Sequence, residues 1–107
     1  MITVPDEQMT ALRSSYRASF PTKASNLSQS LQRFESELDS ASLQHVHMLV
    51  HRLAGSAALY GYGALGQQAR SVLNLVDELK LPFGLSVLAD IHEAVLALVE
   101  ALNRESA

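Results

Sequence analysis

The sequence predicts an all-α protein, an antiparallel up-down four-helix bundle with a short or kinked N-terminal helical extension. Apolar residues recur at intervals of three and four positions through nearly the whole chain, which is the spacing of helices that each bury one stripe. No stretch shows the alternation of a β-strand, and no internal repeat occurs. The segments between the helical stretches are short, so we expect consecutive helices to pack antiparallel.

The first helical stretch begins near Pro5, a residue that suits the first turn of a helix, and Asp6 and Glu7 complement the positive end of the helix dipole. Its apolar stripe keeps one phase through Pro21, although proline removes a backbone donor and clashes with the preceding turn. Two interpretations remain, one kinked helix or two helices that meet near Phe20, and the unbroken phase favours a kink or a tight junction. The stripe consists of Met9, Leu12, Tyr16, Phe20, Ala24, Leu27, Leu31, Phe34 and Leu38.

The second long helix follows a cluster of capping residue types at Asp39–Ser42, which also ends the first stretch. Its stripe starts at Leu43, and we expect the helix to stop near Tyr60. Gly61 and Gly63 provide the turn, one of them as a left-handed cap.

The third helix has its apolar stripe between Tyr62 and Leu79, and the segment Leu81–Gly84 breaks it. The last helix uses an apolar stripe from Leu85 to Leu102. Each helix exceeds two turns, which is enough for an up-down bundle.

Composition limits the classes of protein to which the chain can belong. Its 107 residues predict one domain, residues 1–107, and the lack of cysteine excludes disulfides and fits a cytoplasmic location. The net charge of −3 and the scattered basic residues predict no nucleic-acid surface. No apolar run approaches the ~18 residues of a membrane span, so we expect no membrane partner. No nucleophile elbow or Walker-type loop indicates a conventional enzyme, and a single reactive face predicts a monomer.

His51 lies on the polar face of the second long helix. With Leu53 as the core direction, His51 lies about 160° away around the helix. His47, His51 and Gly55 form a row at i, i+4 and i+8, and Ala58 shares this outer face. Glycine inside a helix costs about 1 kcal/mol relative to alanine. Close approach by a partner would explain Gly55, and so would packing against a helix of the same fold.

Three roles are open to His51: an ordinary surface histidine, a metal ligand or a nucleophile. Met48 stands where a zinc protease has glutamate, and no Glu-x-x-His motif occurs, so we expect no metal. Neutral imidazole, whose unperturbed pKa is ~6.5, is a competent nucleophile at neutral pH. An exposed ring nitrogen on a convex helix surface with small neighbours is the geometry that a phosphoryl acceptor needs.

The segment His51–Ala57 resembles the signature of the histidine-containing phosphotransfer (HPt) domain family, which reads H-x-L-K-G-S-[SA]. In that family a glycine follows, and a leucine stands four residues after it. The matching residues, at the right mutual spacing, are His51, Leu53, Gly55, Ser56, Gly61 and Leu65. The resemblance extends in outline over the whole chain.

The resemblance implies a phosphorelay intermediate of a two-component signalling system, with a response-regulator receiver domain and a hybrid histidine kinase as partners. Such a carrier is not an enzyme and has no cofactor of its own, because the receiver supplies the aspartate and Mg²⁺. By position, His51 would be the phosphorylated residue and Gly55 would give the receiver close access. Ser56 would fix the local geometry through a hydrogen bond, and Gln67 or Gln68 would face the docked receiver.

Ala54 departs from the family pattern, which usually has lysine there, near the phosphoryl oxygens. Arg52 projects about 200° away from Ala54 and is a poor substitute. We therefore hypothesise that His47 supplies a proton or a positive charge. Ala54 also leaves an alternative open, a bundle of the same fold that binds a partner without carrying phosphate. The surface expected to meet a partner consists of His47, Met48, Arg52, Ala54, Gly55, Ser56, Ala58, Gln67 and Gln68.

Overall fold

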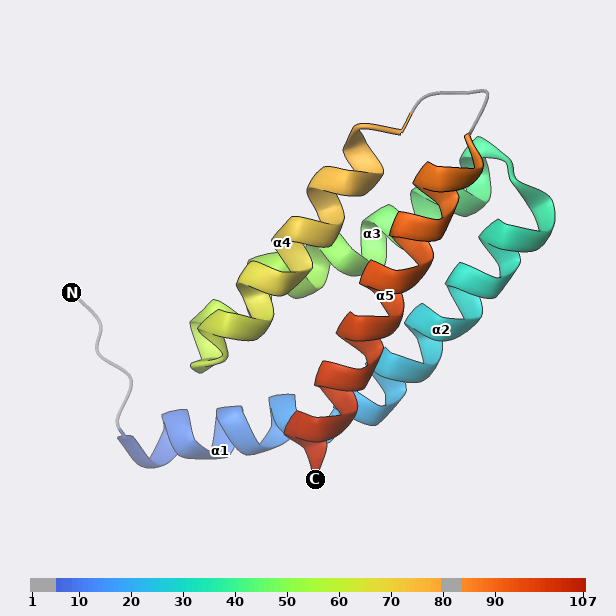
Figure 1. Cartoon of the computed structure of the whole chain (residues 1–107). Coiled ribbons are helices and arrows are strands. Elements are labelled where there is room, and N and C mark those ends of the chain that lie inside the picture. The colour runs from blue at the N-terminus through green and yellow to red at the C-terminus, as the bar shows by residue number, and fades with distance from the viewer. Residues whose placement is uncertain (1–5, 80–83) are drawn as a thin grey trace.

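The computed structural model describes residues 6–79 and 84–107, and all regular structure in these ranges is helical (Figure 1). The elements are α1 (Asp6–Ala18), α2 (Phe20–Glu37), α3 (Ser40–Ser56), the short 3-10 helix η1 (Ala58–Tyr60), α4 (Gly63–Asp77) and α5 (Leu85–Ser106). Helices α2, α3, α4 and α5 run alternately in opposite directions and pack against one another, while α1 projects from one end (Figure 1). The predicted all-α bundle with an N-terminal extension is confirmed.

The N-terminal stretch forms two helices, α1 and α2, which meet at Ser19. Pro21 lies in the first turn of α2, where its missing N–H breaks no helical hydrogen bond. The tight junction near Phe20 is therefore the correct interpretation, and the start predicted at Pro5 lies outside the described residues. None of the residues of α1 is buried, and Leu12 is 45% exposed. The first part of the predicted stripe is thus wrong as core, because α1 touches only one end of the bundle.

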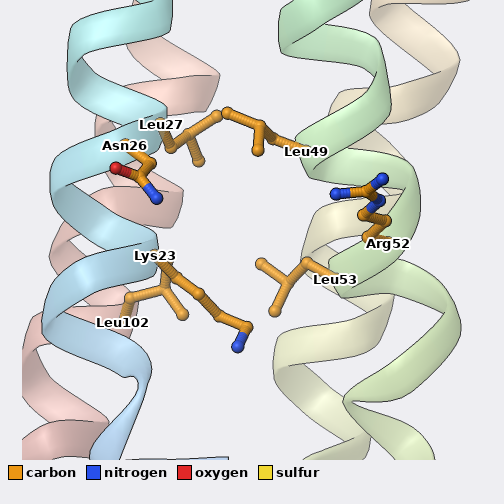
Figure 2. Close-up of a pocket in the computed structure, with 7 residues that line it drawn as sticks. All are labelled: Lys23, Asn26, Leu27, Leu49, Arg52, Leu53 and Leu102. Atoms are coloured by element: carbon orange, nitrogen blue, oxygen red, sulfur yellow. The ribbon is translucent and has the colours of Figure 1, made fainter.

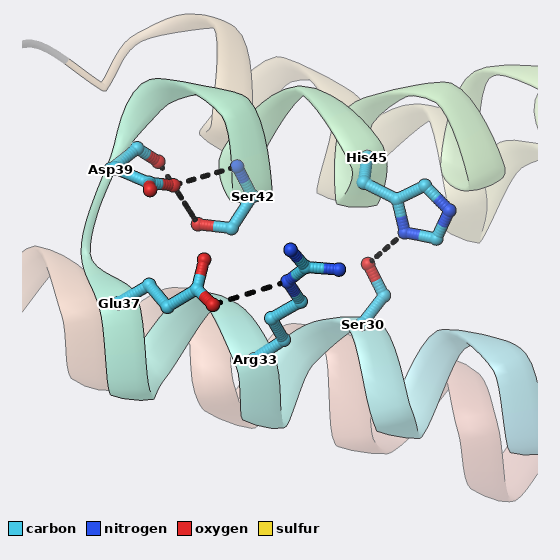
Figure 3. A network of polar contacts seen from close by, with 6 residues as sticks. All are labelled: Ser30, Arg33, Glu37, Asp39, Ser42 and His45. Atoms are coloured by element: carbon cyan, nitrogen blue, oxygen red, sulfur yellow. Dashed lines mark hydrogen bonds and ion pairs between the residues drawn. The ribbon is translucent and has the colours of Figure 1, made fainter.

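The turn between α2 and α3 follows the predicted capping chemistry. Leu38 adopts a left-handed conformation with φ 51°, and its N–H donates to the Phe34 carbonyl. This turn leaves Leu38 43% exposed, so the stripe ends before it. Asp39 Oδ1 accepts from the Ser42 N–H at 2.8 Å and from Ser42 Oγ at 2.6 Å (Figure 3). These two hydrogen bonds, from the Ser42 side chain and backbone, lower the pKa of Asp39.

Helix α3 is shorter than predicted. It ends at Ser56, and the chain then tightens into η1 because the Tyr62 N–H donates to the Ala57 carbonyl at 2.9 Å. Gly61 is the left-handed residue, with φ 88°, and Gly63 begins α4 instead. A Cβ at Gly61 would lie 3.1 Å from Nε of the exposed Arg13 side chain, which can move, so the positive φ is what requires glycine there.

The core lies between α2, α3, α4 and α5. Of the predicted breaker Leu81–Gly84, only Gly84 is described, and it precedes α5. Leu85, the first residue of the predicted last stripe, is 86% exposed, so the buried face of α5 starts later. The largest fully buried side chains are Phe20, Phe34, Leu31, Ile91, Leu98, Leu102, Val46, Val50, Val72 and Val95.

Candidate functional site

His51 lies in the second half of α3 with its side chain exposed. The buried residues on either side of it in sequence, Val50 and Leu53, face the core and are 0% and 3% exposed. The structure thus places His51 on the outer surface, as the helical phase predicts.

Gly55 lies one turn after His51 and is exposed. A Cβ built at Gly55 would meet nothing within 4 Å. Packing against another helix of the same fold therefore does not explain this glycine. It keeps the surface beside His51 low, so that a partner can approach the imidazole without a steric obstacle.

His47 lies one turn before His51, and the two imidazole rings are nearly parallel, with centroids 6.0 Å apart and an interplanar angle of 9°. Its Nε2 contacts Asp77 Oδ1 of α4 at 2.8 Å. This contact holds the His47 ring beside His51 and brings a carboxylate to the edge of the site. Sequence reasoning missed Asp77, because helical periodicity does not show which residues face each other across two helices.

Ser56 forms hydrogen bonds at the C-terminal end of α3. Its Oγ donates to the Arg52 carbonyl at 2.8 Å and lies 2.6 Å from the hydroxyl of Tyr16 in α1. The Tyr16 ring stacks on Tyr60, with centroids 4.4 Å apart. Burial raises the pKa of Tyr16, the hydrogen bond with Ser56 opposes this rise, and the nearby Tyr60 adds to it. Tyr16 thus ties α1 to the end of the histidine helix, which the sequence did not reveal.

Ala54 does not lie on the outer surface, contrary to the expectation that it meets a partner. It is 6% exposed and packs on the side of α3 that faces α4. A Cβ built at Gly66 of α4 would lie 3.5 Å from Ala57 Cβ and 3.6 Å from the Ala54 carbonyl oxygen. Small residues on both helices allow this close approach, so the position one turn from His51 that would hold lysine belongs to a helix contact.

The remaining predicted partner residues differ in exposure. Arg52 is exposed and Met48 is half-buried on α3, whereas Ala58 is exposed in η1 and so does not continue the helical row. On α4, Gln67 is exposed and Gln68 is half-buried.

No three His, Cys, Asp or Glu side chains in residues 6–79 and 84–107 lie together as metal ligands would. Over the same part of the chain, no helix combines the length and the apolar character needed to cross a membrane.

The fold and this surface define a class of protein, a helical bundle that presents an exposed histidine on a helix, with a glycine one turn after it that leaves the surface open. The family model of the Hpt domain matches residues 11–105, nearly the whole chain. The chain belongs to the Hpt domain family, whose members are phosphocarrier modules that serve phosphotransfer in two-component signalling. No curated protein and no solved structure matches the chain.

Proposed function

We propose that the protein is a phosphorelay intermediate in which His51 accepts a phosphoryl group from the aspartate of one receiver domain and donates it to another. The observation that supports this most is the open surface at Gly55, directly beside the exposed imidazole of His51. A phosphoryl acceptor needs a nucleophile that a second active site can enclose, and a low convex helix face provides it.

The transfer needs only one nitrogen of His51 from this chain. The neutral imidazole nitrogen attacks the phosphorus of the aspartyl phosphate, the P–N bond forms, and the P–O bond to the aspartate breaks. The aspartate leaves as a carboxylate, and the ring loses the proton of its other nitrogen to solvent. The receiver supplies the aspartate and the Mg²⁺ that offsets the charge of the phosphoryl oxygens. The reverse sequence passes the group to the next receiver.

The proposed partners are a response-regulator receiver domain and a hybrid histidine kinase, which meet a monomeric cytoplasmic carrier in turn. The outer row, defined as His47, His51 and Gly55, would lie at the centre of their contact. Met48 adds partly buried apolar surface next to this row, and Arg52 adds an exposed cation. Protein interfaces commonly combine apolar surface with charged groups at the rim.

His47 lies beside His51 and contacts the carboxylate of Asp77 through Nε2. We infer that His47, oriented by Asp77, supplies a proton or a positive charge to a phosphoryl group on the neighbouring ring. Its imidazole is parallel to that of His51, and its Nε2–H donates to the Asp77 carboxylate. Without His47, the carboxylate of Asp77 would lose the partner that it has in this structure.

A second candidate function rests on Ala54. The position holds alanine and is buried against α4. For this reason α3 has no basic side chain there, one turn after His51. The same surface could serve as a docking module that binds a receiver without carrying phosphate.

Incubation with a phosphorylated receiver domain and Mg²⁺ distinguishes the two functions. A phosphorelay intermediate takes up an acid-labile, base-stable label, whereas the His51→Gln variant takes up none. Because His51 is exposed, the variant should keep its free energy of unfolding within about 0.5 kcal/mol of the wild type. Receiver binding without any label on the wild type would favour the docking module instead.

A further inference from the structure

A cavity of about 230 Å³ lies between α2 and α3 and reaches inward to α5 (Figure 2). It is separate from the outer row, because its α3 wall is the side of that helix that faces α2. Figure 2 shows side chains from both helices pointing into the gap, with Leu27 and Leu49 approaching each other across it. The lining residues are Lys23, Asn26, Leu27, Leu49, Arg52, Leu53 and Leu102.

The inner part of the cavity is apolar. Leu27, Leu53 and Leu102 are 2%, 3% and 0% exposed, so they close the inner end of the cavity as a floor that belongs to the core, and the half-buried Leu49 adds the apolar wall that a ligand can reach. The volume is below the ~300–1,000 Å³ of sites for drug-sized ligands, and such sites commonly lie between the helices of bundles. The floor therefore suits a short hydrocarbon chain or a single ring.

The outer part of the cavity is positively charged. Lys23 extends from α2 and Arg52 from α3, and no acidic residue is among the described residues that line the cavity. The chain as a whole holds eleven acidic residues against eight basic ones, so this local excess runs against its composition. Two cations above an apolar floor complement a ligand with one anionic end.

Neither cation has an anionic partner within the described part of the chain. Lys23 Nζ donates to Ser19 Oγ at 2.6 Å and lies 4.9 Å from the centre of the Tyr16 ring, and neither Lys23 nor Arg52 takes part in a salt bridge there. Burial lowers the pKa of Lys23, because its ammonium group loses water without gaining a counter-charge.

The hollow next to this cavity, farther along α2 and α3, does not offer the same charge. It is lined by Ser30, Arg33 and His45 among others. There Arg33 pairs with Glu37 at 3.3 Å, and Ser30 Oγ lies 2.7 Å from His45 Nδ1 (Figure 3). The unpaired positive charge on this side of the bundle is thus concentrated at Lys23 and Arg52.

We propose that this cavity binds a small amphipathic carboxylate, with its apolar body on the leucine floor and its carboxylate between Lys23 and Arg52. Arg52 offers a planar fork of donors for both carboxylate oxygens, and Lys23 offers a point charge from the opposite wall.

Octanoate is the probe that tests this site, and the leucine methyl resonances of the whole protein report on it. Saturable shifts of Leu27, Leu53 and Leu102 are expected, with octanol and octylamine bound at least about tenfold more weakly because they lack the charge-assisted hydrogen bonds. Arg52→Gln should weaken octanoate binding about tenfold. Arg70→Gln, which removes an exposed arginine of α4 outside the cavity, is the matched control and should leave binding unchanged.

Three results would overturn the proposal. Octanoate could fail to shift these methyl groups, octanol could bind equally well, or Arg52→Gln and Arg70→Gln could weaken binding to the same extent. Lys23→Gln gives a second, independent variant, and circular dichroism shows that each variant is folded. If a receiver domain shifts the methyl groups and octanoate does not, the cavity is part of a protein-docking surface and the carboxylate site is wrong.

Discussion

Two helical glycines on facing helices, Gly55 of α3 and Gly66 of α4, are surrounded by opposite environments. A Cβ at Gly55 would meet open space, whereas one at Gly66 would be in van der Waals contact with Ala57 and the Ala54 backbone. Glycine weakens a helix by about the same amount at either position, roughly 1 kcal/mol relative to alanine. At Gly66 the close packing of two helices compensates for this, but at Gly55 nothing inside the fold does.

The comparison separates two surfaces of α3. The outer row of His47, His51 and Gly55 lies at the surface of the bundle, and we assign it to phosphoryl transfer. The packed flank, defined as Ala54, Ala57 and Gly66, holds α3 against α4. Changes in the outer row should therefore alter transfer and leave stability intact, and changes in the packed flank should do the reverse.

The largest effect is expected from Gly55→Leu. The new side chain would project beside His51 and block the approach of a receiver, so the transfer rate should fall about a hundredfold, the equivalent of ~2.7 kcal/mol. The free energy of unfolding should stay equal or rise by up to about 1 kcal/mol, because leucine favours a helix and meets nothing. Label uptake and urea unfolding measure the two quantities. A loss of stability with unchanged transfer would place Gly55 in the packed flank.

Gly66→Leu should produce the opposite pattern. A leucine side chain cannot fit the contact with Ala57 and the Ala54 carbonyl, and overpacking of this kind typically costs about 1–3 kcal/mol. The folded fraction should still transfer phosphate at close to the wild-type rate. Gly66→Ala is the control, because the added methyl group would lie at ordinary contact distance, and it should be neutral or stabilising. Equal destabilisation by both variants would contradict this account.

A smaller effect on transfer is expected at His47, the first residue of the outer row. His47→Gln removes the ring that lies beside His51 and contacts Asp77, so transfer should slow about tenfold, the equivalent of ~1.4 kcal/mol. Adding Asp77→Asn should restore part of the rate, because the uncompensated carboxylate is then gone. Rates that are unchanged in His47→Gln would remove the role that we infer for this pair.

The smallest effect is expected at Tyr16, which joins α1 to the end of α3. Tyr16→Phe removes the hydrogen bond with Ser56 and should lower the free energy of unfolding by about 1 kcal/mol. The folded-state pKa of Tyr16 is raised, so the unfolded chain ionises first and wild-type stability falls as the pH rises above the ordinary value of 10.0. This alkaline loss should be smaller in Tyr16→Phe than in Tyr62→Phe, a control ring from the same cluster.

The sequence was sufficient to place the outer row. A stripe with Leu53 at its centre determines which residues face outward, and both His51 and Gly55 are exposed as the phase predicts. The expectation that Ala54 meets a partner came from the family pattern and not from the helical phase, and it was wrong. Its helical phase places it on one side of the stripe, but only the position of α4 decides that this side is covered.

Contacts between distant segments could not be predicted from the sequence either. The Asp77–His47 and Tyr16–Ser56 contacts depend on how two helices are aligned, which periodicity within one helix does not encode. The residue at which α3 ends could not be predicted for a different reason. Residues 55–58 are compatible with a longer helix, and the turn is set by the left-handed Gly61 and the Tyr62–Ala57 hydrogen bond.

The most direct test of the central claim is to locate the phosphoryl group among the four histidines of the chain. Nitrogen NMR of the imidazole rings, recorded after incubation with a phosphorylated receiver and Mg²⁺, makes this assignment. The account predicts that only the ring of His51 acquires a P–N bond and that the His51→Gln variant acquires none. A phosphoryl group on His47, or an unmodified His51 in a protein that still binds the receiver, would contradict it.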